Sequence, residues 1–312
     1  MKHIFQIALL FASALATSCD DSSDNPLSTP TNAKLIGYVS TDSQIITPTN
    51  PNGFGARILS NTYNNGIGTI SFSNAVTAIG ERAFWQCTTL QEITLPDRIR
   101  DIEDSAFGGC TNLTGITIPA RVTEIGDGAF AYCDNLSAFY GNIATIDNRC
   151  LVIGTTLEAF APAGLTTYSI FDGITEIGGG AFEGADNIVG ISLPNSINEI
   201  DERAFAYCLG LTSITIPTGV TEIEPSTFEG CSALNSVILP NTITQIDIMA
   251  FSGCTSLQNI YCPATTPPRI AAGTFSDITT TAIIYVPTAA VTAYKTADGW
   301  EDYANAIVGY DF

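Results

Sequence analysis

A phenylalanine recurs along most of this chain at intervals of 23 or 24 residues, with a single longer interval of 52 residues. Other apolar residues keep fixed positions relative to each phenylalanine. A constant period of this length is typical of solenoids, in which each repeat forms one coil and neighbouring coils bury a shared core. We therefore predict a repeat solenoid, and we expect its core to be anchored by Phe84, Phe107, Phe130, Phe182, Phe205, Phe228, Phe251 and Phe275.

The unit from Leu113 to Cys133, LTGITIPARVTEIGDGAFAYC, shows what one coil contains. Ile116 and Ile118 flank a threonine, as expected for a short strand with one buried face. Pro119 ends this strand because its nitrogen cannot donate a ladder hydrogen bond. The segment around Phe130 is compatible with a short helical turn. Each coil is therefore expected to have a strand on one side and a helical turn on the other.

The pattern L-x-x-I-T-I-P-x-x-V-x-x-I-G-x-x-A-F-x-x-C recurs from about Ile70 to Phe275 and resembles the BspA-like leucine-rich repeats of bacterial surface proteins. The resemblance implies an extracellular role in adhesion or ligand binding, without naming a ligand. The expected fold class is a mainly β leucine-rich-repeat solenoid with short helical turns and a period of about 23 residues. We expect an N-terminal β cap and a C-terminal cap of a strand and a helix.

The first 18 residues are typical of an export signal, with Lys2 before an apolar run that is too short to span a bilayer. The sequence ATSC ending at Cys19 resembles a bacterial lipobox, which implies lipid attachment at Cys19. The implied location is the bacterial outer membrane at the cell surface, with membrane contact through the lipid anchor only. Ordinary cleavage near Ser18, leaving a soluble protein, is the alternative. Residues 19–32 are polar, contain two prolines, and are expected to form a flexible tether.

Two regions outside the regular repeats are expected to cap the solenoid. Residues 33–75 contain short β-like runs broken by Gly, Pro and Asn, which favour an antiparallel β cap; a separate ligand-binding domain is the alternative. Residues 277–312 begin with a strand-like run, after which Thr288 is placed to cap a helix that reaches about Ala297 and ends at Gly299. Trp300 and Tyr303 would then cover the last coil.

The repeats occupy residues 76–276 and include one elongated unit at about 135–181. After Ile146, Leu151 holds the position of the repeat phenylalanine, and the next regular one is Phe182. The extra sequence, CLVIGTTLEAFA, contains two apolar runs around Gly154 and predicts a hairpin that extends from the solenoid. Such an insertion can also carry binding specificity.

The charge balance limits the classes of partner. The chain has 312 residues and a net charge of -20, from 11 Lys and Arg against 31 Asp and Glu. Nucleic acid is an unfavourable partner, because basic residues are needed to displace the counterions of phosphates. The single histidine, His3, lies in the expected leader. A mature chain without histidine lacks the commonest general base, so we expect no enzyme, no metal site and no cofactor.

Most of the cysteines occupy one position of the repeat. Six of the nine follow the repeat phenylalanine by three residues, and Ala185 fills the same position in one unit. A position shared by Cys and Ala indicates a small buried side chain, so we predict buried free thiols. Disulfides between neighbouring coils are the alternative, although parallel side chains suit disulfide torsion angles poorly. The six are Cys87, Cys110, Cys133, Cys208, Cys231 and Cys254.

Acidic residues recur directly before an inward isoleucine of the repeat, at Asp101, Glu124, Glu176, Glu199 and Glu222. An exposed acidic ladder tolerates the mutual repulsion of its members in water, so we interpret it as a solvated face. Two alternatives remain open at this point: calcium bridging between carboxylates, and a carboxylate pair for glycoside hydrolysis.

A further ladder consists of the outward residue of each predicted strand: Thr94, Thr117, Tyr140, Ser169, Ser192, Thr215, Ile238 and Tyr261. Extended sheet faces are where solenoids bind partners, and tyrosines are common binding hot spots. We interpret the chain as a non-enzymatic surface protein that binds a host protein, a matrix protein or a glycan through this ladder. The alternatives are a carbohydrate-active accessory protein or hydrolase that uses the acidic residues, and a purely structural envelope component.

Overall fold

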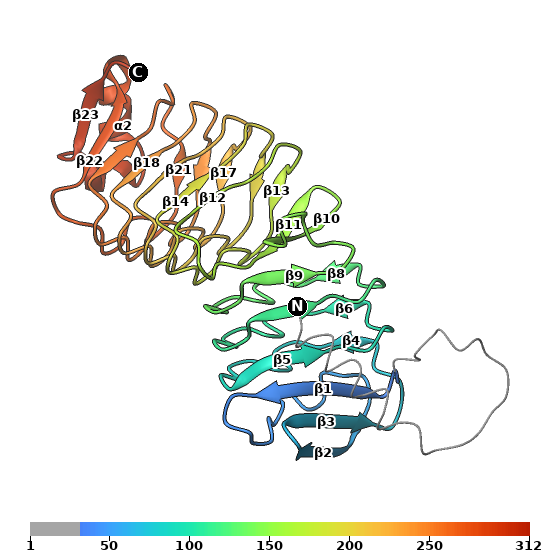
Figure 1. The fold of residues 1–312 in the computed structure, drawn as a ribbon. Coiled ribbons are helices and arrows are strands. Elements are labelled where there is room, and N and C mark those ends of the chain that lie inside the picture. Colours follow the sequence, from blue (N-terminus) through green and yellow to red (C-terminus); the bar gives the residue numbers. More distant parts are fainter. Residues whose placement is uncertain (1–31) are drawn as a thin grey trace.

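The computed structural model describes residues 32–312, so the expected signal peptide, Cys19 and nearly all of the tether lie outside the described residues. In the described residues, successive coils stack into one elongated solenoid, which bends once near its middle (Figure 1). Each regular coil contains a longer strand, a two-residue strand and a run of tight turns. The predicted leucine-rich-repeat solenoid, with its capped ends, is confirmed.

The longer strands form two separate sheets, one on each side of the bend. In spatial order, the N-terminal sheet contains β2 (Ile58–Asn64), β3 (Ile67–Phe72), β1 (Leu35–Ser40), β5 (Leu90–Thr94), β7 (Gly115–Thr117) and β9 (Ala138–Tyr140). The C-terminal sheet contains β12 (Thr167–Ser169), β14 (Gly190–Ser192), β16 (Ser213–Thr215), β18 (Ser236–Ile238), β20 (Asn259–Tyr261), β22 (Ile283–Pro287) and β23 (Ile307–Tyr310).

The second side of the solenoid is built from short strands, most of which bury an isoleucine. One group contains β4 (Ala78–Ile79), β6 (Asp101–Ile102) and β8 (Glu124–Ile125). The next contains β10 (Cys150–Ile153), β11 (Thr156–Phe160), β13 (Glu176–Ile177) and β15 (Glu199–Ile200). The last contains β17 (Glu222–Ile223), β19 (Gln245–Ile246) and β21 (Arg269–Ile270).

The third side differs from the expected helical turn: it is a run of tight turns. In the unit of Phe107, the amide of Gly108 donates to the carbonyl of Ser105 (2.9 Å), while the amide of Phe107 donates to Ala129 of the next coil (2.8 Å). Amides therefore alternate between bonds within the coil and bonds between coils. Ser105 and Gly109 have φ values of 52° and 73°, which an α-helix cannot accommodate.

The repeat phenylalanines lie in two columns, not one. Rings of successive coils stack nearly parallel, with centroids 5.1–5.6 Å apart, within Phe84–Phe130 and within Phe182–Phe275. Between the columns, Phe139 packs edge-on against Phe130 and Phe160 packs against Phe182. All eight repeat rings are buried.

The elongated repeat separates the two columns with a hairpin. Strands β10 and β11 pair antiparallel around a two-residue turn at Gly154 and Thr155, where Gly154 has a φ of 63° that favours glycine. Leu157 of this hairpin packs into the C-terminal core, whereas Leu151 packs into the N-terminal core. The hairpin is therefore a partition between two cores, and not a bulge on the outside of one.

The bend follows from where this insertion lies. On the turn side, the coils on either side of it contact each other directly: the Gly128 amide donates to the Gly179 carbonyl (2.9 Å) and the Tyr132 amide to the Glu183 carbonyl (3.0 Å). On the sheet side, β9 and β12 belong to different sheets. The extra chain thus widens the stack on one side only, and the solenoid bends toward its turns (Figure 1).

The N-terminal cap is a three-stranded antiparallel unit. Strand β1 pairs antiparallel with β5, the first repeat strand, and β2 and β3 form a hairpin around Asn65 and Gly66. Both turn residues have positive φ, as Asn-Gly hairpin turns require. Phe54 continues the first column, with its ring centroid 5.6 Å from that of Phe84. The cap therefore covers the first coil with both backbone pairing and an aromatic ring.

The C-terminal cap differs in detail from the expectation. Thr288 does not cap a helix; it begins the short 3-10 helix η1 (Thr288–Ala290), which leads into α2 (Val291–Thr296). Gly299, with a φ of 78°, precedes a second 3-10 helix, η2 (Trp300–Tyr303). Trp300 is fully buried, and its indole nitrogen donates to the carbonyl of Pro268 at 2.7 Å. Strand β23, which the sequence analysis did not predict, adds one more strand beyond the helices.

Candidate functional site

The outward residues of the two sheets are the predicted ligand face. Inward partners such as Ile214 and Ile260 are buried, which turns their neighbours on each strand outward. The parallel register then aligns outward residues of successive coils, for example Ile238 with Tyr261 and Tyr261 with Tyr285. Side chains from residues far apart in sequence thus form continuous rows along the solenoid.

The structure divides the predicted face between the two sheets. Thr94, Thr117 and Tyr140 lie on the N-terminal sheet, and Ser169, Ser192, Thr215, Ile238 and Tyr261 lie on the C-terminal sheet. Thr94, Tyr140 and Tyr261 are half-buried, and the others are exposed. The bend therefore separates the predicted tyrosines, Tyr140 and Tyr261, which do not form one contact surface.

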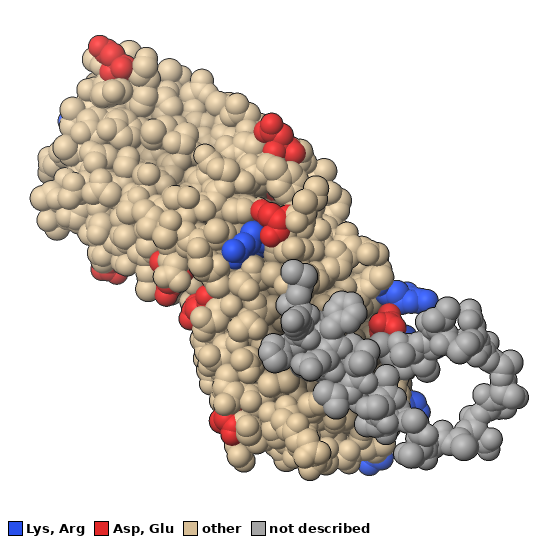
Figure 2. All heavy atoms as spheres, viewed as in Figure 1, with Lys and Arg blue, Asp and Glu red and all other residues tan. Residues whose placement is uncertain are grey.

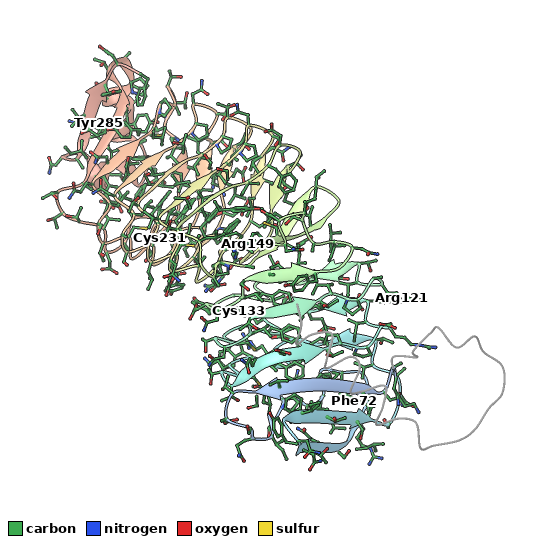
Figure 3. The ribbon with its side chains drawn as sticks, viewed as in Figure 1. Phe72, Arg121, Cys133, Arg149, Cys231 and Tyr285 are labelled. Atoms are coloured by element: carbon green, nitrogen blue, oxygen red, sulfur yellow. The ribbon has the colours of Figure 1, made fainter. Side chains whose placement is uncertain are left out.

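Tyr261 belongs to an aromatic cluster that sequence reasoning largely missed. Its ring stacks on that of Tyr285, with centroids 4.7 Å apart and an interplanar angle of 11°. The ring of Tyr310 stands edge-on to both, at 5.7 Å and 5.5 Å, and Phe312 lies 5.0 Å from Tyr310. We call Tyr261, Tyr285, Tyr310 and Phe312 the aromatic cluster. It lies at the C-terminal end of the sheet, where Figure 3 labels Tyr285.

The outward face carries no charge over most of its length. Strands β7, β9, β12, β14, β16, β18, β20, β22 and β23 contain no Asp, Glu, Lys or Arg. In a chain with a net charge of -20, the charges are therefore concentrated elsewhere. In the view of Figure 2, Asp, Glu, Lys and Arg form scattered patches on an otherwise uncharged surface.

The predicted acidic ladder is also interrupted by the hairpin. Asp101 pairs in register with Glu124, and Glu176 pairs with Glu199, but β11 lies between the two groups. Glu124, Glu199 and Glu222 are exposed. Among residues 32–312, no three His, Cys, Asp and Glu side chains are grouped so that they could hold a metal ion.

Carboxyl groups at the bend have unusual pKa values. Burial, reinforced by the nearby carboxylates of Glu176, Asp127 and Asp201, raises the pKa of Glu158 to about 7. Burial likewise raises the pKa of Asp201 to about 7, with repulsion from Glu176 and Glu199 as the next largest causes. These groups come from the N-terminal half, the hairpin and the C-terminal half, so the bend brings them together.

A second network at the bend lies among the turns. Arg203 forms ion pairs with Glu183 and with Glu229, the latter at 3.7 Å. Tyr132 and Tyr207 donate hydroxyl hydrogen bonds to these two glutamates, at 3.0 Å and 2.9 Å respectively. The hydrogen bond to Glu183 raises the pKa of Arg203, and burial raises that of Tyr132. No sequence pattern marked these residues, because each occupies a variable position of its repeat.

The eight cysteines within residues 32–312 are buried free thiols, as predicted. Burial raises the pKa of the Cys133 thiol to about 12, so it stays protonated and unreactive at neutral pH. Each thiol of the regular units acts instead as a donor: Cys231 Sγ, for example, lies 3.1 Å from the carbonyl oxygen of Phe205 in the preceding coil. Cys133 and Cys231 are labelled in Figure 3, one on each side of the bend.

Comparison with known proteins agrees with this architecture. The model of the BspA type leucine rich repeat region matches residues 58–158 and 153–282, in six copies. A leucine rich cell surface protein from Faecalibacterium prausnitzii A2-165 is similar in structure, with 31% identity and a TM-score of 0.61 over 76% of this chain. This chain spans 61% of the length of that protein.

The pneumococcal vaccine antigen PcpA shares the fold at 17% identity, with a TM-score of 0.53 over 76% of this chain and 66% of that one. No curated protein matches the sequence. Within residues 32–312, no helix has the length and apolar character needed to cross a membrane. The family model covers well over half of the chain, and the chain therefore belongs to the BspA-type leucine-rich-repeat family.

Proposed function

We propose that this protein is a non-enzymatic binding or adhesion protein that presents the outward face of its sheets to a host protein, a matrix protein or a glycan. The observation that carries this proposal is the exposed, uncharged, register-aligned face that ends in the aromatic cluster. Monomeric proteins rarely leave large apolar groups together on the surface without a partner.

The rigidity of the solenoid supports a binding role. Stacked phenylalanine rings and hydrogen bonds between coils hold the outward residues in fixed positions before a partner arrives. A preorganised surface loses little conformational entropy on binding, so a modest number of contacts gives useful affinity.

The proposed location is the bacterial cell surface, through a lipid on Cys19. The support is the lipobox-like sequence ending at Cys19, together with the description of the F. prausnitzii relative as a cell surface protein. Incorporation of labelled fatty acid should be lost in Cys19→Ser, and protease added to intact cells should digest the wild-type protein. Protection of the protein from protease in intact cells would contradict a surface location.

Binding can be tested on immobilised matrix proteins and polysaccharides. The expected result is saturable binding that weakens about 10-fold in Tyr261→Ala, as hot-spot truncations do. Tyr140→Ala, on the other sheet, separates the contributions of the two faces, because the bend places them on different surfaces. Absence of saturable binding to every immobilised partner would contradict the proposal.

A further inference from the structure

The aromatic cluster leaves ring surface available for a ligand. Because Tyr261 and Tyr285 stack on each other, the faces between them are already covered. Tyr310 and Phe312 lie at the open end and are 44% and 56% exposed. Val308, 45% exposed, pairs in register with Tyr285 and extends the apolar surface. About half of the surface of each of these three side chains is therefore open to solvent within residues 32–312.

A hollow adjoins the cluster and adds polar groups. It has a volume of about 660 Å³, and Val308 is one of its lining residues. Val308 pairs in register with Tyr285 of the aromatic cluster, so the hollow lies beside the cluster. Its apolar lining includes Phe275 and Tyr303, and its polar lining includes Asn305 and the carboxylate of Asp302. An apolar floor with a few hydrogen-bonding groups is the usual make-up of a small-molecule subsite.

The hydroxyl groups of the cluster are also available. The Tyr285 hydroxyl lies 3.5 Å from Oδ1 of Asn259, at the limit of a hydrogen bond. Within the described chain, no hydrogen bond occupies the hydroxyls of Tyr261 and Tyr310. The site therefore offers aromatic faces and free hydroxyls side by side.

Charge identifies the kind of occupant. An acidic polymer would be repelled by a chain of net charge -20. A basic protein surface would need carboxylates with which to form ion pairs, but strands β18, β20, β22 and β23 carry none. The nearest sequence neighbour with a charge, Asp311, already accepts a hydrogen bond from Thr288 at 3.0 Å. The surface thus favours a partner that is polar but uncharged.

Building on the proposed binding function, we propose that the aromatic cluster and the adjoining hollow bind an uncharged glycan. The pyranose ring of a neutral sugar has a C–H face, which the negative face of an aromatic ring attracts, and hydroxyls around its edge. The rings of Tyr310 and Phe312 would stack on the C–H faces. Asp302 and Asn305 in the hollow would bond the hydroxyls of the next sugar.

The test uses the full chain against two panels: neutral polysaccharides (glucan, mannan, galactan and xylan), with heparin and hyaluronan as charged controls, and immobilised matrix proteins. We expect retention by at least one neutral polysaccharide and not by the acidic ones. Binding should weaken about 10-fold in Tyr310→Ala combined with Phe312→Ala. Tyr310→Phe, which keeps the ring, should lose much less.

Phe171→Ala is the matched control, because Phe171 is an exposed aromatic residue just after β12, at the opposite end of the same sheet. All three altered side chains are exposed, so unchanged melting temperatures are expected throughout. Binding to a matrix protein without binding to any neutral polysaccharide would overturn the glycan assignment and leave the proposed function standing. Polysaccharide binding that the double variant leaves intact would overturn the site. Binding to neither panel would overturn the proposed function and the glycan assignment together.

Discussion

The hydroxyl group of Tyr132 donates a hydrogen bond to Oε1 of Glu183, 3.0 Å away, although 51 residues separate the two in sequence. The ring of Tyr132 lies so close to Gly184 that a Cβ atom there would approach it to 2.3 Å. Tyr132 belongs to the last regular coil before the elongated repeat, and Glu183 to the first coil after it. This contact therefore holds the two halves together across the bend.

Arg203 should stabilise the turns beside that junction, because it forms an ion pair with Glu183, the partner of Tyr132. Arg203→Met leaves the carboxylates of Glu183 and Glu229 without their cation, and these side chains are only 9% and 16% exposed. Breaking a buried ion pair costs 3–5 kcal/mol, and Arg203 is partly exposed, so we expect a loss of about 1–2 kcal/mol in the free energy of unfolding. Chemical denaturation measures it. The exposed Arg121, which extends from the surface in Figure 3, is the control: Arg121→Met should change stability by less than about 0.5 kcal/mol.

Phe205→Ala should open a cavity in the middle of the second column. Phe205 is fully buried, with stacked neighbours at 5.1 Å and 5.4 Å. Removing a buried phenylalanine ring costs about 3–5 kcal/mol. Denaturant titration followed by circular dichroism should show the loss, whereas the exposed Phe171→Ala should not. An unchanged unfolding midpoint for Phe205→Ala would contradict a core role.

Stability should fall as the pH rises from acid to neutral. The pKa values of Glu158 and Asp201 are about 7 in the folded state, against about 4 in an unfolded chain. The folded state thus holds protons that the unfolded chain has released, and the free energy of unfolding decreases between these two pKa values. Melting temperatures measured from about pH 5 to pH 8 should decline.

Variants can assign this pH dependence. Glu158→Gln combined with Asp201→Asn should flatten the profile and raise stability at pH 8, because the neutral amides avoid the repulsion. Glu222→Gln is the control, since Glu222 is an exposed member of the acidic ladder. If the double variant kept the wild-type slope, the pH dependence would have to arise outside the bend.

The thiols should be unreactive in the native protein. All eight cysteines of residues 32–312 are free and buried, and five of them donate to the carbonyl of a phenylalanine in the preceding coil. A thiol reagent should therefore react slowly under native conditions and with all eight after denaturation, without prior reduction. Recovery of fewer than eight thiols in denaturant would indicate disulfides.

Periodicity accounts for how much of this fold could be predicted. Ile116, Phe130 and Cys133 recur at fixed spacing because each fills the same slot of every coil, so one unit predicts the rest. The sequence predicts a helical turn around Phe130 because Ala129 and Cys133 lie four residues apart and would share one side of a helix. The segment forms tight turns instead, because it has residues with positive φ and donates hydrogen bonds to the next coil, 22 residues away in sequence.

The elongated repeat shows where periodicity stops being informative. The repeat phase places Ile146 at the position of the inward isoleucines such as Ile125, yet it is fully exposed in a turn. Its loop is fixed by Asp147, whose carboxylate accepts hydrogen bonds from Thr145 and from the Arg149 amide. Local turn chemistry of this kind overrides repeat phase. The hairpin can separate two cores because both of its faces are apolar. A hairpin that only bulged from the solenoid would need one apolar face at most.

The candidate site was only half predictable. Tyr261 was identified because it continues the outward row, but Tyr285 continues the same row and was assigned to a cap. Tyr310 could not be placed, because its strand follows two 3-10 helices and one α-helix that break the period. Contacts such as that of Arg203 with Glu183 depend on coil stacking at variable positions, for which one sequence offers no signal.

The bend limits the shape of a partner that can bind to both sheets. Strand β9 is the last strand of the N-terminal sheet, and β12 is the first strand of the C-terminal sheet. The outward surfaces of the two sheets are therefore tilted with respect to each other (Figure 1). A stiff, straight fibre can lie along the outward surface of one sheet or of the other, but not along both at once. Only a flexible or jointed partner could follow the whole length of the molecule.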